Sequence, residues 1–283
     1  MKTVRDIAAM RAAVRDWREV GERVALVPTM GNLHRGHLSL VELARARADR
    51  VVVSIYVNPT QFGPSEDYAD YPRTLDADRR RLRRAGADVV FVPGDEEMYP
   101  FGLQAMTRVS VPLLTEKFCG ASRPGHFDGV TSVVARLFGI VQPDLAVFGQ
   151  KDYQQWLVIR RMTADLHMPV EILSGPTQRE RDGLALSSRN QYLDPDERRR
   201  APALYRSLQR CAQAIEAGRR DYAALEADGR QALEAAGFQV DYFAVCRADD
   251  LAPPAAGDRQ LVILAAGRLG RARLIDNVLV TSA

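Results

Sequence analysis

The strongest constraint on the fold is a short apolar run that ends in a glycine-containing loop with two histidines. Residues 24–27 (VALV) are followed by PTMGNLHRGH at residues 28–37, and an amphipathic segment continues over residues 38–48. This succession predicts a strand, a tight loop and the start of a helix. Because glycine has no Cβ, Gly31 and Gly36 would let a ligand approach the backbone closely.

His34 and His37 stand where this helix would begin, so their imidazoles should share one face of its first turn. Backbone N–H groups and the positive end of the helix dipole would point the same way, which predicts a phosphate site. Half of a metal site is one alternative, although no cysteine or acidic residue stands nearby at ligand spacing. A turn without a function is the other alternative.

Composition narrows the class of protein. The 283 residues are 46% hydrophobic and 27% charged, and 39 basic against 36 acidic residues leave a net charge of +3. These values are typical of a globular protein and give no support for nucleic acid as a partner. The sequence has no run of ~20 apolar residues, so no membrane span is predicted, and the N-terminal residues do not resemble a signal peptide. Three scattered cysteines favour reduced thiols in a cytoplasmic protein.

Apolar runs alternate with helical segments, which predicts an α/β fold with a Rossmann-like parallel sheet that binds a nucleotide. Further strands are expected at residues 51–57, 88–93, 107–111, 145–148 and 169–173. Helices are expected at residues 3–17, 76–85 and 129–141, and another opens at residues 149–152 and runs to residue 166.

A break at residues 175–177 predicts a domain boundary, with residues 1–176 in the first domain and residues 177–283 in a smaller α+β domain. The second domain is expected to contain helices at residues 195–217 and 221–236, and strands at residues 240–245, 260–266 and 273–280.

Polar residues follow two of the predicted parallel strands. Asn58 and Gln61 come directly after one of them, and ligands of open α/β sheets bind at the carboxyl ends of strands. A Pro–Gly turn without a function is equally compatible. Gly149 and Lys151 follow another strand and predict a second phosphate site, where the lysine supplies a compact charge. Asp152 is equally suited to capping the next helix.

Three other segments carry charge. Arg123 would suit a carboxylate or a phosphate, or else belong to an ordinary surface loop. Ser187, Ser188 and Arg189 could form a polyphosphate clamp, with a polar linker as the alternative. The basic run at residues 79–84 is more typical of a solvated helix face than of a nucleic-acid site.

The loop at residues 28–37 resembles the signature of the H-x-G-H nucleotidylyltransferase superfamily, and its full string resembles the pantoate–β-alanine ligase family. Four other strings resemble that family's pattern: NPTQF at 58–62, YPRT at 71–74, GQKDYQQ at 149–155 and LALSSRN at 184–190. The resemblance implies ATP-dependent condensation of (R)-pantoate with β-alanine through a pantoyl adenylate, with release of AMP and diphosphate.

The resemblance also implies roles for single residues. His34 and His37 would stabilise the transferring phosphate, with His37 as proton donor, and Lys151 would act with them. The ATP contacts would be Met30, Gly31, Asn32, Leu33, His34, Arg35, Gly36, His37, Gly149, Gln150, Lys151, Asp152, Gln178, Leu186, Ser187, Ser188 and Arg189.

Gln61 would hold pantoate and β-alanine, Gln155 would hold pantoate, and Asn58 and Arg123 would belong to the same substrate site. At Gln178 the family more commonly has an apolar residue, so its ATP contact could use either backbone or side chain. Mg²⁺ would accompany ATP, although no carboxylate cluster identifies its protein ligands.

The first domain would then be the ATP- and pantoate-binding catalytic domain, the second a lid, and the chain would form a homodimer. Two rival functions remain open. Another nucleotidylyltransferase, forming a dinucleotide or a CDP-alcohol, would need the H-x-G-H loop but not NPTQF. A non-catalytic nucleotide- or RNA-binding module would use the basic run at residues 79–84.

Overall fold

A computed structural model describes residues 1–64 and 66–282 of the chain. They form two compact units. The first contains residues 1–149 and 158–176, and the second contains residues 150–157 and those from Thr177 onward. No helix among the described residues has both the length and the hydropathy that crossing a bilayer requires.

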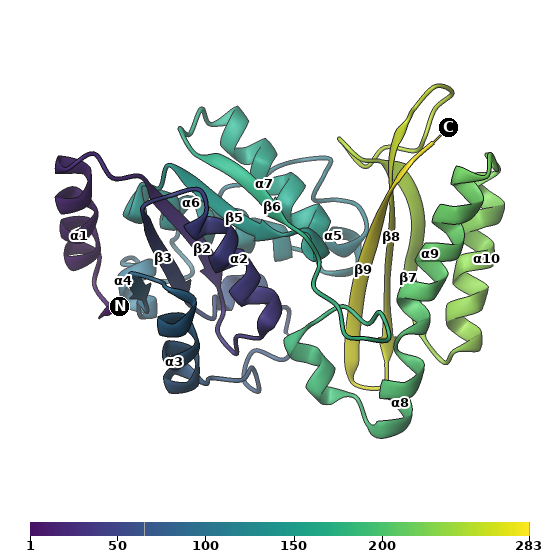
Figure 1. Ribbon diagram of the computed structural model, residues 1–283, viewed down its shortest axis with the longest axis horizontal. Helices are drawn as coiled ribbons and strands as arrows, with labels where there is room; N and C mark the ends of the chain where they lie inside the picture. The colour runs from purple at the N-terminus through teal and green to yellow at the C-terminus, as the bar shows by residue number, and fades with distance from the viewer. Residues whose placement is uncertain (65, 283) are drawn as a thin grey trace. The chain divides into compact units, whose positions relative to one another are not determined.

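The first unit is built on a parallel sheet of six strands in the order β1-β4-β3-β2-β5-β6 (Figure 1). Val24–Thr29 (β2) lies between β3 (Arg50–Ile55) and β5 (Leu145–Gly149). Because these three strands are parallel, the loops that follow them leave the same edge of the sheet. Its first four residues are fully buried, as expected for a strand with helices on both faces. The remaining strands are β1 (Lys2–Val4), β4 (Val89–Phe91) and β6 (Glu171–Gly175).

Helices connect the strands of this sheet (Figure 1). They are α1 (Ile7–Glu19), α2 (Arg35–Arg45), α3 (Leu75–Ala85), α4 (Asp95–Met98), α5 (Cys119–Ser122), α6 (His126–Val141) and α7 (Tyr153–Asp165), with a 3-10 turn η1 (Pro59–Gln61). In α3 the acidic first turn and the basic last turn both complement the helix dipole, and Gly86 ends the helix with a φ of 83°.

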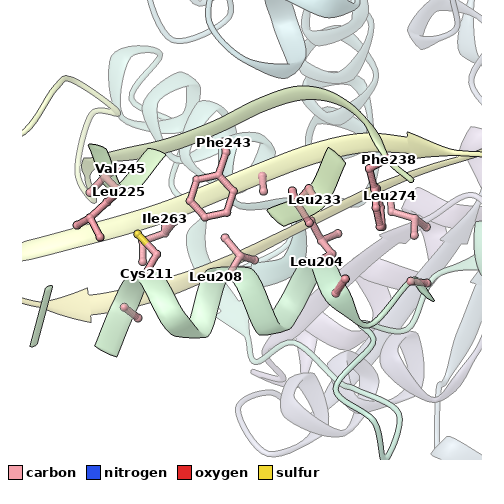
Figure 2. Close-up of a cluster of buried hydrophobic side chains, with 14 of the residues drawn as sticks. Leu204, Leu208, Cys211, Leu225, Leu233, Phe238, Phe243, Val245, Ile263 and Leu274 are labelled. Carbon is pink, nitrogen blue, oxygen red and sulfur yellow. The ribbon is translucent and has the colours of Figure 1, made fainter. Parts of the chain in front are cut away.

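The second unit has an antiparallel sheet in the order β7-β8-β9, packed against two helices. Figure 2 shows its core, where Leu208 and Cys211 of α9 lie near Phe243 and Ile263 of the sheet. The elements are η2 (Gln150–Asp152), η3 (Ser188–Tyr192), α8 (Pro195–Arg200), α9 (Ala203–Glu216), α10 (Tyr222–Ala235), β7 (Gln239–Arg247), β8 (Gln260–Leu269) and β9 (Ala272–Thr281). A mixed α/β fold with a parallel sheet and a smaller antiparallel unit confirms the predicted fold class.

Three predicted elements were wrong in extent or kind. The helix predicted at residues 3–17 begins only at Ile7, because residues 2–4 pair with β4 at the sheet edge and Asp6 caps the helix. The helix predicted at residues 195–217 is divided in two next to Pro202, whose missing N–H cannot continue a helix.

The strand predicted at residues 107–111 is absent, since the described backbone there is irregular. Val109 instead hydrogen-bonds to α6 through both of its backbone groups: its N–H donates to the hydroxyl oxygen of Ser132, and its carbonyl oxygen accepts from the hydroxyl of Thr131. The alternation of apolar residues at 107–111 therefore belongs to a segment that packs against a helix. Periodicity alone cannot distinguish such a segment from a strand.

Candidate active site

His34 and His37 meet on the first turn of α2, as their spacing predicted. His34 Nδ1 accepts a hydrogen bond from the N–H of Gly36 at 3.1 Å, and His37 Nδ1 accepts one from the N–H of His34 at 3.3 Å. The ring centroids are 4.1 Å apart. Because each Nδ1 is an acceptor, each neutral ring carries its proton on Nε2. The loop thus fixes two N–H donors of one tautomer side by side.

The backbone ahead of these rings is already hydrogen-bonded within the unit. The N–H of Gly31 donates to Thr29 Oγ1 at 3.2 Å, and the N–H groups of Asn32 and Leu33 donate to Asp78 at 2.9 and 2.8 Å. Gly31 and Asn32 have φ values of 84° and 49°, which close the turn. These three N–H groups are therefore satisfied within the fold, and the ATP contacts predicted at residues 31–33 stay a prediction.

Nothing in the sequence indicated that Asp78 and Arg81, on α3, contact this loop. Asp78 is fully buried, and Arg81 donates to the carbonyl oxygen of Leu33. Arg81 belongs to the run interpreted as a solvated helix face, and it is exposed as that interpretation predicts, while its guanidinium also bonds the loop. Their contacts with the loop cross more than forty residues of sequence, so no local pattern signals them.

Asn58 and Gln61 lie after β3, as predicted, but in different environments. The Asn58 side chain is buried, with Nδ2 donating to Gln61 Oε1 at 3.2 Å and to the carbonyl oxygen of Gly129 at 3.1 Å. Gly129 permits this approach, since a Cβ there would lie 2.3 Å from the carbonyl oxygen of Thr60. Gln61 is half-buried, and its Nε2 lies 3.0 Å from Met30 Sδ. Asn58 therefore supports Gln61, which adjoins the histidine loop.

Arg123 is engaged by a carboxylate of its own unit. It pairs with Glu66 through hydrogen bonds of 2.6 and 2.5 Å, and reaches the carbonyl oxygen of Gln61 at 3.2 Å. His126 lies 2.9 Å from Arg123 and 2.8 Å from the same carbonyl. Burial raises the pKa of Glu66, but the hydrogen bonds and charge of Arg123 outweigh burial and lower it to about 2. The guanidinium is thus neutralised beside the main chain of Gln61, and its contact with a substrate stays a prediction.

The predicted second phosphate loop opens with the 3-10 turn η2, and α7 begins after it. Lys151 Nζ lies 3.7 Å from Asp152 Oδ2. The side chain of Asn277, on β9, donates to the carbonyl oxygens of Gln150 and Lys151, each at 2.9 Å. Asn277 was missed in the sequence because it lies at the other end of the chain. Gln155 is half-buried in the first turn of α7.

Residues 178–189 form a folded-back loop in the second unit. The N–H of Leu186 donates to the carbonyl oxygen of Gln178 at 2.9 Å, which brings two predicted ATP contacts together. Ser187 accepts from the N–H of Arg189 at 3.2 Å and caps η3, where Ser188 and Arg189 stand.

Arg179 anchors this loop to β9. It pairs through two nitrogens with the buried Asp276 and lies over the ring of Tyr205, 3.7 Å from the centroid. Burial raises the pKa of Asp276, while the hydrogen bonds from Arg179 oppose that rise. Asp276 and Asn277, adjacent on β9, therefore hold both predicted ATP loops of this unit.

The described residues identify no ligand set for a resident metal. In residues 1–64 and 66–282, no three His, Cys, Asp or Glu side chains are arranged to hold one. Mg²⁺ commonly binds through substrate phosphates and retained waters, with one or two protein carboxylates. A magnesium ion bound in that way needs no cluster of three protein ligands.

Comparison with known proteins identifies the family. The profile of pantoate–β-alanine ligases matches residues 2–279. The chain belongs to the pantoate–β-alanine ligase family. The pantothenate synthetase of Pseudomonas putida is 58% identical over 278 residues, which cover 98% of this chain and 97% of that protein. That of Azotobacter vinelandii is 56% identical over 280 residues, covering 99% of each.

Solved structures of pantoate–β-alanine ligases agree with the fold. Pantothenate synthetase from Thermus thermophilus matches with a TM-score of 0.92 at 51% identity, covering 98% of this chain and 99% of that one. The ligase from Francisella tularensis, whose crystal is a complex with β-γ ATP and β-alanine, matches with a TM-score of 0.83 at 32% identity, covering 99% and 97%. The predicted pantoate–β-alanine ligase family is confirmed, and the chain is a ligase.

Proposed function

We propose that this chain condenses (R)-pantoate with β-alanine at the expense of ATP, giving pantothenate, AMP and diphosphate through a pantoyl adenylate. The observation that carries the proposal is the paired imidazole arrangement of His34 and His37 in a chain that matches the pantoate–β-alanine ligase profile over residues 2–279. Two fixed Nε2–H donors suit the charge that develops on a transferring phosphate.

In the first step a carboxylate oxygen of pantoate attacks the α-phosphorus of ATP. The bond from that phosphorus to diphosphate breaks, and diphosphate leaves with the electron pair. Little covalent chemistry falls to the protein, so the residues act by positioning and charge neutralisation. His34 and His37 stabilise the transferring phosphate through their Nε2–H groups, and Lys151 neutralises phosphate charge. As proton donor, His37 acts in its protonated form and gives its proton to an oxygen of the departing diphosphate.

In the second step the amine nitrogen of β-alanine attacks the acyl carbon of the adenylate. The bond between that carbon and the oxygen of AMP breaks, and the amine proton passes to solvent. Gln61 holds pantoate and then β-alanine, with Asn58 behind it, and Gln155 holds pantoate. Arg123 supports the same site through its contact with the main chain of Gln61.

The ATP contacts proposed are residues 30–37, 149–152, 178 and 186–189, and ATP arrives with Mg²⁺.

The unit formed by β7–β9 with its helices acts as the lid domain of a catalytic domain that ends at residue 176. The chain works as a cytoplasmic homodimer. Sedimentation equilibrium tests the dimer, which a monomer across the micromolar range would refute.

The direct test measures AMP and diphosphate released from ATP and Mg²⁺ with D-pantoate, with and without β-alanine. AMP formation that requires both substrates, with pantothenate as the product, is the expected result. ATP turnover that needs neither substrate would contradict the proposal and indicate a different nucleotidyl acceptor. Binding of ATP without turnover would indicate a non-catalytic module.

A further inference from the structure

A buried carboxylate of α3 is directed at the loop that carries the two histidines. Asp78 is fully buried, and its oxygens accept hydrogen bonds from the N–H of Asn32 at 2.9 Å, the N–H of Leu33 at 2.8 Å and the hydroxyl of Thr74 at 3.0 Å. A buried carboxylate is stable only with such donors, and the same N–H groups would be unsatisfied without it.

One turn further along α3, Arg81 binds the other backbone group of Leu33, its carbonyl oxygen. Its guanidinium donates to the carbonyl oxygen of Leu33 and lies 3.8 Å from Asp78. The N–H of Leu33 is therefore bound by the carboxylate of Asp78 and its carbonyl oxygen by the guanidinium of Arg81, and both side chains belong to α3. The next residue is His34, the N-cap of α2.

The loop has little freedom around these contacts. Asn32 adopts a φ of 49°, and a Cβ on Gly31 would lie 3.3 Å from Asp78 Oδ2 and 3.1 Å from Ile55 Cγ2. If Asp78 or Arg81 released the backbone, the peptide before His34 could rotate, and the hydrogen bonds that fix both imidazoles would loosen. A misplacement of about 1 Å can lower a rate about 10²-fold.

We infer that Asp78 and Arg81 are positioning residues, which hold the backbone of Leu33 so that His34 and His37 keep their orientation. Neither is assigned a contact with the reacting atoms. The inference rests on the proposed function for its catalytic consequence, whereas its structural consequence can be measured on the protein without substrate.

The test compares Arg81→Met with Arg84→Met. Both changes remove one guanidinium from the exposed part of α3, so they alter charge and helix propensity alike. Only Arg81 bonds the loop. We expect Arg81→Met to lower kcat about 10-fold with little change in the KM for ATP, and Arg81→Lys to recover part of the loss. Arg84→Met should match the unaltered protein.

Asp78→Asn is a second variant, with an expected loss in kcat of about 10- to 100-fold, because one oxygen acceptor becomes a donor facing an N–H. The chain has four histidines, so ring ¹⁵N spectra can be assigned. The Nε2–H tautomer of His34 and His37 should become a mixture in Arg81→Met and Asp78→Asn, and persist in Arg84→Met.

Unchanged kcat and unchanged tautomers in Arg81→Met would overturn the inference, as would equal effects of Arg81→Met and Arg84→Met. Failure of the proposed function looks different. The unaltered protein would then form no AMP from ATP, pantoate and β-alanine, while the histidine spectra would still decide whether Asp78 and Arg81 orient the rings.

Discussion

Asn277 donates its side-chain amide to the backbone carbonyl of Lys151 at 2.9 Å, across 126 residues of sequence. A second hydrogen bond of the same length reaches the carbonyl of Gln150. The side-chain oxygen of Asn277 is buried, with no hydrogen-bond partner among the described residues. Asn277 thus donates both hydrogen bonds to the proposed phosphate loop, while its own side-chain oxygen has no partner among the described residues.

Asn277→Ala should therefore weaken ATP binding. Two carbonyl groups lose their donor, which is worth about 1 kcal/mol for each hydrogen bond, and Lys151 loses its fixed backbone. We expect the KM for ATP to rise about tenfold or more, since 1.4 kcal/mol is a factor of ten, with the KM for pantoate little changed. Leu279→Ala, two residues along the same strand and exposed, is the matched control. Equal ATP affinity in the two variants would refute the role.

His37→Ala removes the proposed proton donor of the adenylation step. We expect the rate of AMP formation to fall about 10²- to 10⁴-fold, as is typical for loss of a positioned acid. His167→Asn is the control, because His167 is exposed and asparagine tolerates its φ of 50°. Near-normal turnover of His37→Ala, measured by diphosphate release in single-turnover mixing, would remove His37 from the mechanism.

Lys151→Arg tests why a chain with 36 arginines keeps a lysine here. The lysine side chain is only 18% exposed beside Asp152, and a planar guanidinium cannot replace a compact ammonium in such a space. We expect kcat/KM for ATP to fall about tenfold, equivalent to ~1.4 kcal/mol. Lys2→Arg, at an exposed position, should have no effect. Full activity of Lys151→Arg would show that the lysine is incidental.

Glu66 should make stability depend on pH in acid. Arg123 holds the pKa of Glu66 at about 2, below the usual value of 4.5. A lowered pKa means that the ionised carboxylate stabilises the fold above about pH 4.5, and that this stabilisation is lost as the pH falls toward 2. Glu66→Gln should lower the free energy of unfolding at pH 7 by about 1–2 kcal/mol, allowing for solvent screening.

The difference between the unaltered protein and Glu66→Gln should shrink as the pH is lowered from 5, which urea unfolding at several pH values would measure. Asp70→Asn, an exposed neighbouring carboxylate, is expected to show no such convergence. A difference that stays constant with pH would mean that the Glu66–Arg123 pair contributes no titration-linked stability.

Local chemistry was enough to predict the histidine loop and the sheet that carries it. A β-branched apolar run predicts a strand buried on both faces, and two histidines three residues apart must share a helical turn, because both consequences follow from backbone periodicity alone. The same reasoning placed Gln61 at the end of β3 and Lys151 after β5. The family strings added which acid and which amine the chain would join.

Tertiary structure alone decided what holds these groups. Asp78 and Arg81 clamp Leu33, Glu66 neutralises Arg123, and Asn277 supports Lys151. Each contact joins residues far apart in sequence, and the buried Asp78 looks in sequence like any exposed aspartate. Loop N–H groups that suggested a phosphate cradle proved to be satisfied within the fold. Local sequence specifies which hydrogen-bond donors exist, whereas long-range packing specifies which acceptor each donor binds.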